Sequence, residues 1–275
     1  MRLPLPRRTI DILYSCILIG LILLISGPAF SQSEMDDVEI DVQKVGRGIY
    51  MLTGRGGNLG LSVGTDGAFL VDDQYAPLTE RITAALASVS DKPVRFVVNT
   101  HWHGDHTGGN ENLGKAGALI VAHENVRKRM SVEQFIAAFD MRTGPSPAAA
   151  LPAITFTEEM TFHWNDDVLR VVHVEAAHTD GDSIILFEKA NVAHLGDIFF
   201  NGMYPFIDAG TGGRIDGIIL AVDRALDLMK PDTTIIPGHG PLASVKELRD
   251  YRAMLVKVRD RIRPLIDAGK SRDEV

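Results

Sequence analysis

The feature of this sequence that most constrains its fold is a cluster of metal-binding residue types directly after a continuous apolar stretch. Residues 94–99 predict a buried strand, and the turn that follows them carries His101, His103, Asp105 and His106 within six positions. Imidazole and carboxylate groups bind Zn²⁺ at neutral pH, and a turn that leaves a rigid strand can direct several of them at one point. The fold must therefore bury this strand and leave its carboxyl end open to an ion.

The same turn contains Gly104, Gly108 and Gly109, which we expect to adopt backbone angles that would strain other residues, so that the chain can coil around an ion. One turn cannot complete the coordination of two ions, so further ligands are expected after other strands. Three residues meet that description: His178 follows residues 169–174, Asp197 follows residues 192–195, and His239 follows residues 234–237.

The pattern of apolar residues predicts two similar series of strands and helices. Strands of the first series are expected at 49–53, 59–63, 68–72, 94–99 and 119–122, with helices at 77–89 and 124–139. Strands of the second series are expected at 154–156, 161–164, 169–174, 183–187, 192–195 and 234–237, with helices at 215–229 and 244–268. Residues 143–152, which include three prolines, are expected to form a mobile surface connection. This order indicates an α/β (α+β) fold, an αββα sandwich with two β-sheets face to face and helices outside, in a single domain over residues 32–275.

The N-terminal residues have the pattern of a targeting segment. Three arginines precede the apolar run 12–25, and the small residues Ala29 and Ser31 follow it in the positions that a signal peptidase prefers. The run is shorter than the roughly 20 residues that cross a bilayer. We therefore expect residues 1–31 to be a signal peptide and the protein to be periplasmic or secreted, with no stable membrane span after cleavage. An uncleaved N-terminal anchor is the alternative, and the export route is left open.

Composition excludes several classes of function. The chain of 275 residues has a formal net charge of −8, which removal of residues 1–31 changes to −10, so it lacks the basic surface that nucleic-acid binding requires. The single cysteine, Cys16, lies in the segment expected to be removed, so the mature chain can form neither a disulfide nor a thiolate metal site. Any metal ligands must therefore be nitrogen and oxygen atoms.

These motifs, in this order, resemble those of the metallo-β-lactamase superfamily over about residues 42–245. The resemblance implies the αββα sandwich, and it implies that Asp72 supports the metal ligands from behind. It also implies two Zn²⁺ ions per chain, one held by His101, His103 and His178, a second held by Asp105, His106 and His239, and both bridged by Asp197. A water shared by two such ions would have a pKa of about 7 and would give a hydroxide able to attack a carbonyl or phosphoryl centre. Asp105 and Asp197 would be the catalytic carboxylates. The expected protein is a metal-dependent hydrolase of a small molecule.

Departures from individual branches of that superfamily narrow the substrate. Asp197 stands where one group of β-lactamases has cysteine, and in this the chain is similar to glyoxalase II, lactonases and persulfide dioxygenases. Only 36 residues follow His239, too few for the helical glutathione-binding extension of glyoxalase II. The sequence therefore favours a dizinc hydrolase of an ester, lactone, thioester or β-lactam bond. A mononuclear iron enzyme similar to persulfide dioxygenases and a non-catalytic metal-binding protein are the alternatives.

The remaining candidates have weaker signals. Four other histidines, His123, His163, His173 and His194, are interpreted as structural or solvent-facing, although His194 is close enough to Asp197 to orient a ligand. Trp102 is expected either to stack on a substrate or to pack under the turn. Tyr204 is expected either to form a wall of the pocket or to stabilise an oxyanion. Substrate specificity is assigned to the loops near residues 54–58, 143–152 and 201–214.

Overall fold

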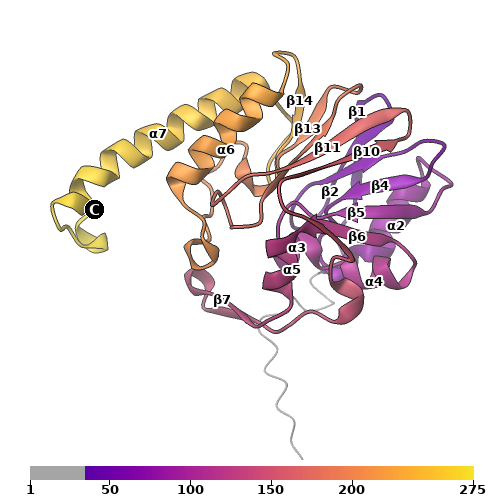
Figure 1. Ribbon diagram of the computed structural model, residues 1–275, viewed down its shortest axis with the longest axis horizontal. Helices are drawn as coiled ribbons and strands as arrows, with labels where there is room; N and C mark the ends of the chain where they lie inside the picture. The colour runs from indigo at the N-terminus through magenta and orange to yellow at the C-terminus, as the bar shows by residue number, and fades with distance from the viewer. Residues whose placement is uncertain (1–34) are drawn as a thin grey trace, which may run out of the picture.

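The computed structural model describes residues 35–275, so the predicted signal peptide, residues 1–31, lies outside the described residues (Figure 1). The first half contains strands β1 (Asp41–Gly46), β2 (Ile49–Thr53), β3 (Leu59–Ser62), β4 (Ala68–Val71), β5 (Val94–Val98), β6 (Leu119–His123), β7 (Gln134–Ile136), β8 (Met141–Thr143) and β9 (Ile154–Phe156). The second half contains β10 (Glu159–Trp164), β11 (Asp167–His173), β12 (Ser183–Phe187), β13 (Val192–His194), β14 (Thr234–Ile236) and β15 (Ala243–Ser244). The α-helices are α2 (Thr79–Ala87), α3 (Gly104–Thr107), α4 (Asn110–Lys115), α5 (Glu124–Met130), α6 (Ile215–Leu228) and α7 (Val245–Asp267). Short 3-10 turns are η1 (Ala76–Leu78), η2 (Ala137–Phe139), η3 (Ala148–Ala150), η4 (Gly196–Ile198), η5 (Ala209–Thr211) and η6 (Arg272–Glu274).

The strands form two large sheets and one separate hairpin. The first sheet has the order β1-β2-β3-β4-β5-β6-β9, antiparallel from β1 to β4 and parallel from β4 to β9. The second has the order β10-β11-β12-β13-β14-β15, in which the β13–β14 pair is parallel and the others are antiparallel. Strands β7 and β8 pair only with each other. Helices α2 and α4 lie outside the first sheet and α6 and α7 outside the second (Figure 1), which confirms the predicted αββα sandwich.

Alternating side chains along the central strands explain the layers. In β4, Phe69 faces the core between the sheets, whereas Leu70 packs with Ile82 of α2 on the outer face. In β12, Phe187 joins the same intersheet core, whereas Leu186 packs with the residues of α6. A strand that is apolar on both faces must be covered on both, so these strands require helices outside and a second sheet inside.

The topology brings the ends of five strands to one edge of the sandwich. In the first sheet β4 and β5 are parallel, so their carboxyl ends coincide. In the second sheet β11, β13 and β14 run in the same direction, because β12 is antiparallel to both β11 and β13. All the predicted ligands follow one of these strand ends, which is the arrangement that the sequence indicated.

Three local predictions were wrong. The helix expected at 124–139 ends at Met130, and the apolar residues beyond it form the β7–β8 hairpin. A short apolar run fits the helical spacing of about 3.6 residues as well as the strand spacing of two, so the sequence pattern did not distinguish them. Strands β1 and β15 were missed, since both lie at sheet edges and contain few apolar residues. The connection at 143–152 is anchored rather than free: Ala150 is buried, and its carbonyl oxygen accepts a hydrogen bond from Nδ2 of Asn110.

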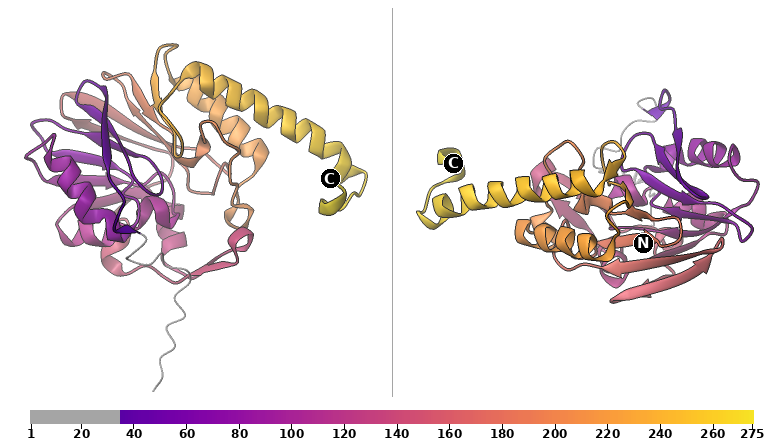
Figure 2. Two further views of the ribbon diagram at one scale, coloured as in Figure 1. Left: turned by 180° about the vertical axis from the view of Figure 1, so that it is seen from behind. Right: turned by 90° about the horizontal axis from the view of Figure 1, so that it is seen from above.

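Helix α7 continues past the body of the sandwich, as Figure 2 shows from two further directions. Its first half packs on the second sheet through Leu248, Tyr251 and Leu255, whereas residues 260–267 are exposed. Within residues 35–275, no helix combines the length and the apolar character that a membrane crossing needs.

Candidate metal centre

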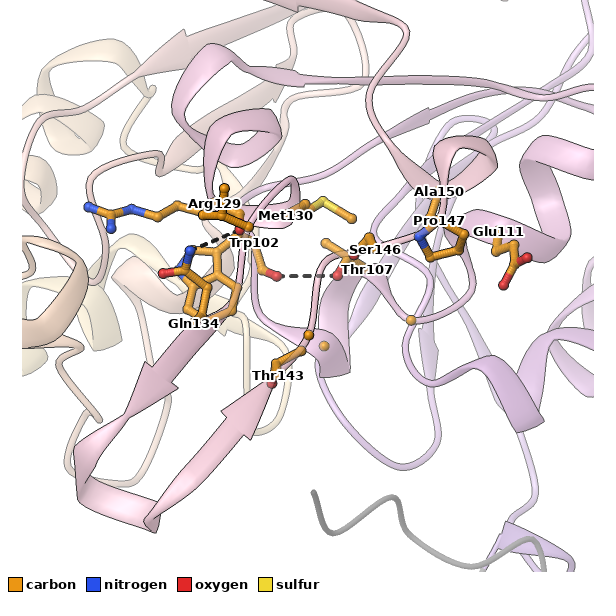
Figure 3. Close-up of a pocket in the computed structure, with 14 residues that line it drawn as sticks. Trp102, Thr107, Glu111, Arg129, Met130, Gln134, Thr143, Ser146, Pro147 and Ala150 are labelled. Carbon is orange, nitrogen blue, oxygen red and sulfur yellow. Dashed lines mark hydrogen bonds between the residues drawn. The ribbon is translucent and has the colours of Figure 1, made fainter. Parts of the chain in front are cut away.

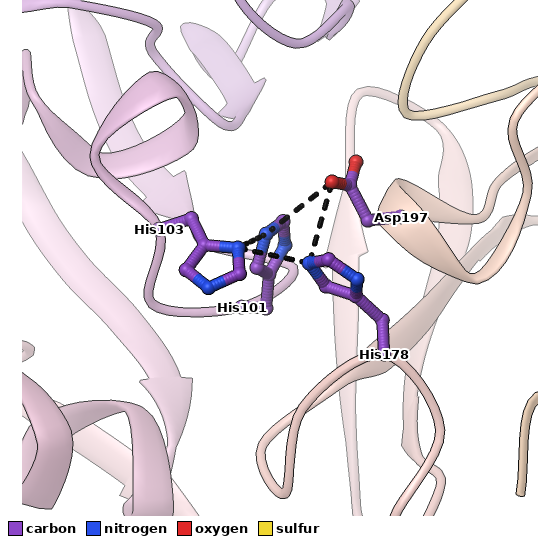
Figure 4. A group of neighbouring side chains, drawn as sticks. All are labelled: His101, His103, His178 and Asp197. Carbon is purple, nitrogen blue, oxygen red and sulfur yellow. Dashed lines mark hydrogen bonds and ion pairs between the residues drawn. The ribbon is translucent and has the colours of Figure 1, made fainter. Parts of the chain in front are cut away.

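A first group of four predicted residues converges at the sheet edge (Figure 4). The group consists of His101, His103, His178 and Asp197, all buried. Nδ1 of His103 lies 3.2 Å from Nε2 of His101 and 2.8 Å from Nε2 of His178. Oδ2 of Asp197 lies 3.7 Å from Nε2 of His101 and 3.4 Å from that of His178. Four ligands about 2.0 Å from a tetrahedral ion are about 3.3 Å apart, so these spacings fit one Zn²⁺.

A second group lies directly beside the first and consists of Asp105, His106 and His239. Nε2 of His239 lies 3.3 Å from Oδ2 of Asp105 and 3.4 Å from Nε2 of His106. Asp197 directs its other oxygen, Oδ1, at this group, 3.1 Å from His106 and 3.4 Å from His239. One carboxylate therefore faces both groups, each through its own oxygen.

A buried acceptor between these residues suits a bound cation. Oδ1 of Asp197 is buried and lacks a well-formed hydrogen bond within residues 35–275, although two imidazoles adjoin it. A buried carboxylate oxygen without hydrogen bonds is costly unless a cation lies near it. The orphaned oxygen and the nitrogen and oxygen donor set both suit a divalent metal ion.

The outer ring nitrogens of four histidines are held by oxygen acceptors. Nδ1 of His106 donates to Oδ2 of Asp72 at 2.7 Å, Nδ1 of His178 donates to the Phe206 carbonyl at 2.8 Å, and Nε2 of His103 donates to Oδ2 of Asp208 at 3.1 Å. The hydroxyl of Thr100 also donates to Asp72, and it lies 3.0 Å from Nδ1 of His101. An acceptor on the outer nitrogen keeps the proton there, which leaves the inner lone pair for a metal.

Burial and charge shift the pKa values within the groups in opposite directions. Burial lowers the pKa of His178 to about 4, and burial together with the neighbouring His106 lowers that of His101. Burial would also lower the pKa of His106, but the carboxylates of Asp197, Asp105 and Asp72 outweigh it and raise the pKa well above its usual value. Burial would raise the pKa of Asp197, but three adjacent imidazoles hold it well below its usual range. Asp197 is therefore an anion in this site.

Asp72 lies where the resemblance implied, behind the ligands. It follows β4 in a left-handed conformation with φ 60°, and its Oδ1 accepts a hydrogen bond from the backbone N–H of Thr100 at 2.7 Å. A non-glycine residue held at positive φ is a strained position that occurs often at functional sites. Asp72 thereby fixes both the start of the ligand turn and one imidazole.

The role expected for the glycines of the turn was wrong. Gly108 and Gly109 have helical φ angles of −65° and −78°. They are needed for close packing: a Cβ at either position would lie 2.7 or 2.8 Å from the backbone oxygens of Gln74 and Asp73. The glycines that make room for the ligands lie elsewhere, because a Cβ on Gly57 would overlap the ring of His106 and one on Gly238 would overlap Asp197.

Three supporting residues were missed by sequence reasoning. Asp208 holds His103, and it also accepts hydrogen bonds from the hydroxyl of Thr211 and the N–H of Gly210. Asp182 closes the loop of His178 by accepting from the backbone N–H groups of residues 178 and 179, and burial raises its pKa to about 7. Asn58 donates to the carbonyls of Pro237 and Gly240 on either side of His239. The signal for Asp182 was its place in the turn Thr-Asp-Gly-Asp; Asp208 and Asn58 gave none, because they lie in irregular loops.

The weaker candidates take structural positions. His194 is fully buried, and its Nε2 contacts the carbonyl of Asn58 at 3.0 Å, so it supports the loop of His239 indirectly. His123 and His173 stack on each other with ring centroids 3.6 Å apart, and His163 is exposed on β10. Trp102 packs in a core cluster under the turn. Tyr204 is 75% exposed and lines a surface hollow against α7.

The comparisons with known proteins agree with this geometry. A family model described as the metallo-beta-lactamase superfamily matches residues 52–239. A hydroxyacylglutathione hydrolase of Nitrosococcus oceani is 27% identical over 168 residues, which are 59% of this chain and 55% of that protein. Another, of Erythrobacter litoralis, is 27% identical over 108 residues, 39% of this chain and 35% of that protein. The chain thus spans about half or less of the length of these curated relatives.

Solved structures show the same fold. A metallo-beta-lactamase from Pontibacter korlensis has a TM-score of 0.65 at 20% identity, covering 79% of this chain and 99% of that one. The DIM-1 metallo-beta-lactamase has a TM-score of 0.66 at 18% identity, covering 81% of this chain and all of the other.

Proposed function

The chain belongs to the metallo-beta-lactamase superfamily, and from that premise we propose that it is a zinc-dependent hydrolase of an ester, lactone, thioester or β-lactam bond, exported to the periplasm or beyond. We propose His101, His103 and His178 as ligands of one Zn²⁺ and Asp105, His106 and His239 as ligands of a second, with Asp197 shared. Export is supported by the targeting pattern of residues 1–31.

The observation that carries this proposal is the orientation of Asp197. Its two oxygens face different groups of ligand atoms, at 3.4 Å from His178 on one side and 3.1 Å from His106 on the other. A structural zinc site is enclosed by its four protein ligands, whereas here the side chains of Asp105 and His239 are partly exposed, so an ion could take water or substrate as a fifth ligand from that side. The donor set therefore favours a catalytic site.

The open side of the site is the side of Asp105 and His239. The side chains of these residues are 22% and 23% exposed, whereas the other candidate ligands are almost fully buried. Two bound Zn²⁺ ions would supply an activated water and would polarise the substrate oxygen. Asp197 would hold the two ligand groups side by side, because each of its oxygens faces one group. Asp105, on the open side, would use Oδ2 as a ligand atom and keep Oδ1 free to hold a proton during bond cleavage.

The relatives suggest where a substrate search begins. The name hydroxyacylglutathione hydrolase identifies an acylated glutathione as the substrate of those proteins, and the name metallo-beta-lactamase identifies a β-lactam. The matches to the hydroxyacylglutathione hydrolases cover only about half of their length or less, so their substrate is one candidate among several. The test panel therefore contains acyl-glutathione, lactones, simple thioesters and nitrocefin.

The test combines metal analysis with that panel. We expect two zinc ions per purified chain and hydrolysis of at least one bond class, and we expect Asp197→Ala and His103→Ala to abolish turnover while the circular dichroism spectrum stays native. His163→Ala, an exposed histidine of β10, is the matched control and should keep full activity. Normal activity in either ligand variant would end the dinuclear proposal, and one iron per chain would favour the oxygenase alternative.

A further inference from the structure

A cavity of about 190 Å³ lies beside the ligand turn, between α3, α5 and the β7–β8 hairpin (Figure 3). Trp102 and Gly104, which flank His103 in the sequence, line it together with Met130, Val132 and Gly144. A cavity of about 150 Å³ is large enough for benzene. The space is therefore sufficient for a ring or a short alkyl chain.

Several of the polar groups around this cavity are already engaged. Nε2 of Gln134 donates to the carbonyl of Arg129, and the hydroxyl of Thr107 donates to the carbonyl of Trp102, as the dashed lines in Figure 3 mark. The guanidinium of Arg129 donates hydrogen bonds to both carboxylate oxygens of Asp180. What the cavity offers to a ligand is the remaining apolar surface of Trp102, Met130, Val132 and Pro147, which suits an uncharged group.

The cavity adjoins the turn that carries four of the candidate ligands. The ring of Trp102 lies 4.6 Å from that of His103, between centroids. Gly104 is followed by Asp105, which lies on the open side of the site, and a Cβ added to Gly104 would meet no atom within 4 Å. Gly104 therefore links the cavity lining to Asp105 in the sequence, and the space beside its Cα is open.

We propose that this cavity binds an apolar side group of about the size of a phenyl ring on the substrate of the metal centre. The inference rests on the proposed hydrolase function, and it narrows the substrate class to arylacyl or short alkylacyl derivatives. Removing such a ring from water contributes about as much as burying a phenylalanine side chain, which corresponds to about tenfold or more in kcat/KM.

The test uses substrate pairs that differ only in this group. Phenylacetyl and acetyl thioesters of N-acetylcysteamine, penicillin G and 6-acetamidopenicillanic acid, and N-phenylacetyl and N-acetyl homoserine lactone cover the thioester, β-lactam and lactone bonds. Gly144→Leu fills the cavity from a position where a Cβ meets no atom within 4 Å and where φ is not positive. Ala148→Leu, which places the same side chain at an exposed residue that does not line the cavity, is the control.

In the zinc-loaded wild type we expect about a tenfold or greater preference for the phenylacetyl member of the hydrolysed pair. Gly144→Leu should reduce this preference to less than about twofold without changing kcat/KM for the small member of the pair. Ala148→Leu should leave the preference unchanged. A second variant, Val132→Asp, places a charge at the cavity from a half-exposed position and should have the same effect as Gly144→Leu. A preference that survives both cavity variants, or that Ala148→Leu also removes, would overturn the inference.

Binding of phenylacetamide, followed by saturation-transfer NMR on metal-free and zinc-loaded protein, separates this inference from the proposed function. If neither these pairs nor the earlier substrate panel is hydrolysed, the hydrolase proposal fails, whereas saturable binding that Gly144→Leu abolishes would still support the cavity as a ligand site. Binding that is absent, or that is the same in Gly144→Leu and wild type, would contradict it.

Discussion

Replacing Asp208 by asparagine tests whether residues that touch no ion hold the ligands in place. Oδ2 of Asp208 accepts hydrogen bonds from Nε2 of His103 at 3.1 Å and from the hydroxyl of Thr211 at 2.7 Å, while Oδ1 accepts from the N–H of Gly210 at 3.1 Å. Every group around this carboxylate is thus a donor. An asparagine has one oxygen only, so in either orientation its NH₂ group opposes at least one of them.

The size of the effect follows from the hydrogen bond to His103. A hydrogen bond to a charged group contributes about 1.5–3 kcal/mol, and loss of an outer partner of a metal-bound histidine lowers metal affinity about 10- to 100-fold. These two ranges agree, because about 1.4 kcal/mol corresponds to a factor of ten. We therefore expect Asp208→Asn to weaken zinc binding at the first group by 10- to 100-fold.

The measurement is a competition titration with a chromophoric zinc chelator, which requires no substrate. Thr211→Val removes the second hydrogen bond of Asp208 but leaves the one to His103, so it should lower the affinity by less than Asp208→Asn does. An Asp208→Asn protein that melts like wild type and binds zinc within about twofold of wild type would refute the reasoning.

Three further predictions concern the site and its surroundings. Asn58→Ala leaves the carbonyls of Pro237 and Gly240 without their donor, so it should cost about 1–3 kcal/mol of stability and weaken the second zinc more than the first, measured by urea unfolding and zinc titration. Burial lowers the pKa of His173, and burial together with His173 lowers that of His123, so both bind protons more weakly when folded. Their contribution to stability is complete above the unfolded pKa of about 6.5 and is lost as the pH falls below it; His173→Gln should reduce the drop in urea midpoint between pH 8 and pH 5.5, and an unchanged drop would count against this pair. Above the dissociation constants, a tenfold rise in free Zn²⁺ should add about 2.7 kcal/mol to the unfolding free energy if two ions bind only the folded chain, but about 1.4 kcal/mol in His239→Ala; equal slopes would argue against a second ion.

Long apolar runs made the central layers predictable from the sequence. Residues 183–187 are buried on both faces, so their burial follows from composition alone whatever the neighbouring strands are. The β7–β8 hairpin was not predictable in the same way. Its apolar residues Phe135, Ile136 and Phe139 also fit a helical spacing, and pairing with Met141–Thr143 through the left-handed Asp140 decided between the two.

The candidate ligands could be predicted from the sequence because chemistry and position coincide in them. His178, Asp197 and His239 each combine a ligand side chain with the end of an apolar strand, and both signals are local. Asp208 has the chemistry without the position, since it lies in the irregular loop before η5 and meets His103 only through the tertiary fold. Contacts between residues about a hundred positions apart in loops have no local sequence signal, which is why the supporting residues had to come from the structure.

The division of the candidate ligands between the sheets would couple metal binding to the core of the protein. The first group takes His101 and His103 from the chain after β5 of the first sheet, and His178 and Asp197 from the second sheet; the second group likewise joins Asp105 and His106 to His239. Neither group can form until the sheets have packed across Phe69 and Phe187. An ion that binds these groups binds only the packed state, so by mass action it stabilises the packing of the two sheets, and that packing in turn sets the affinity for the ion.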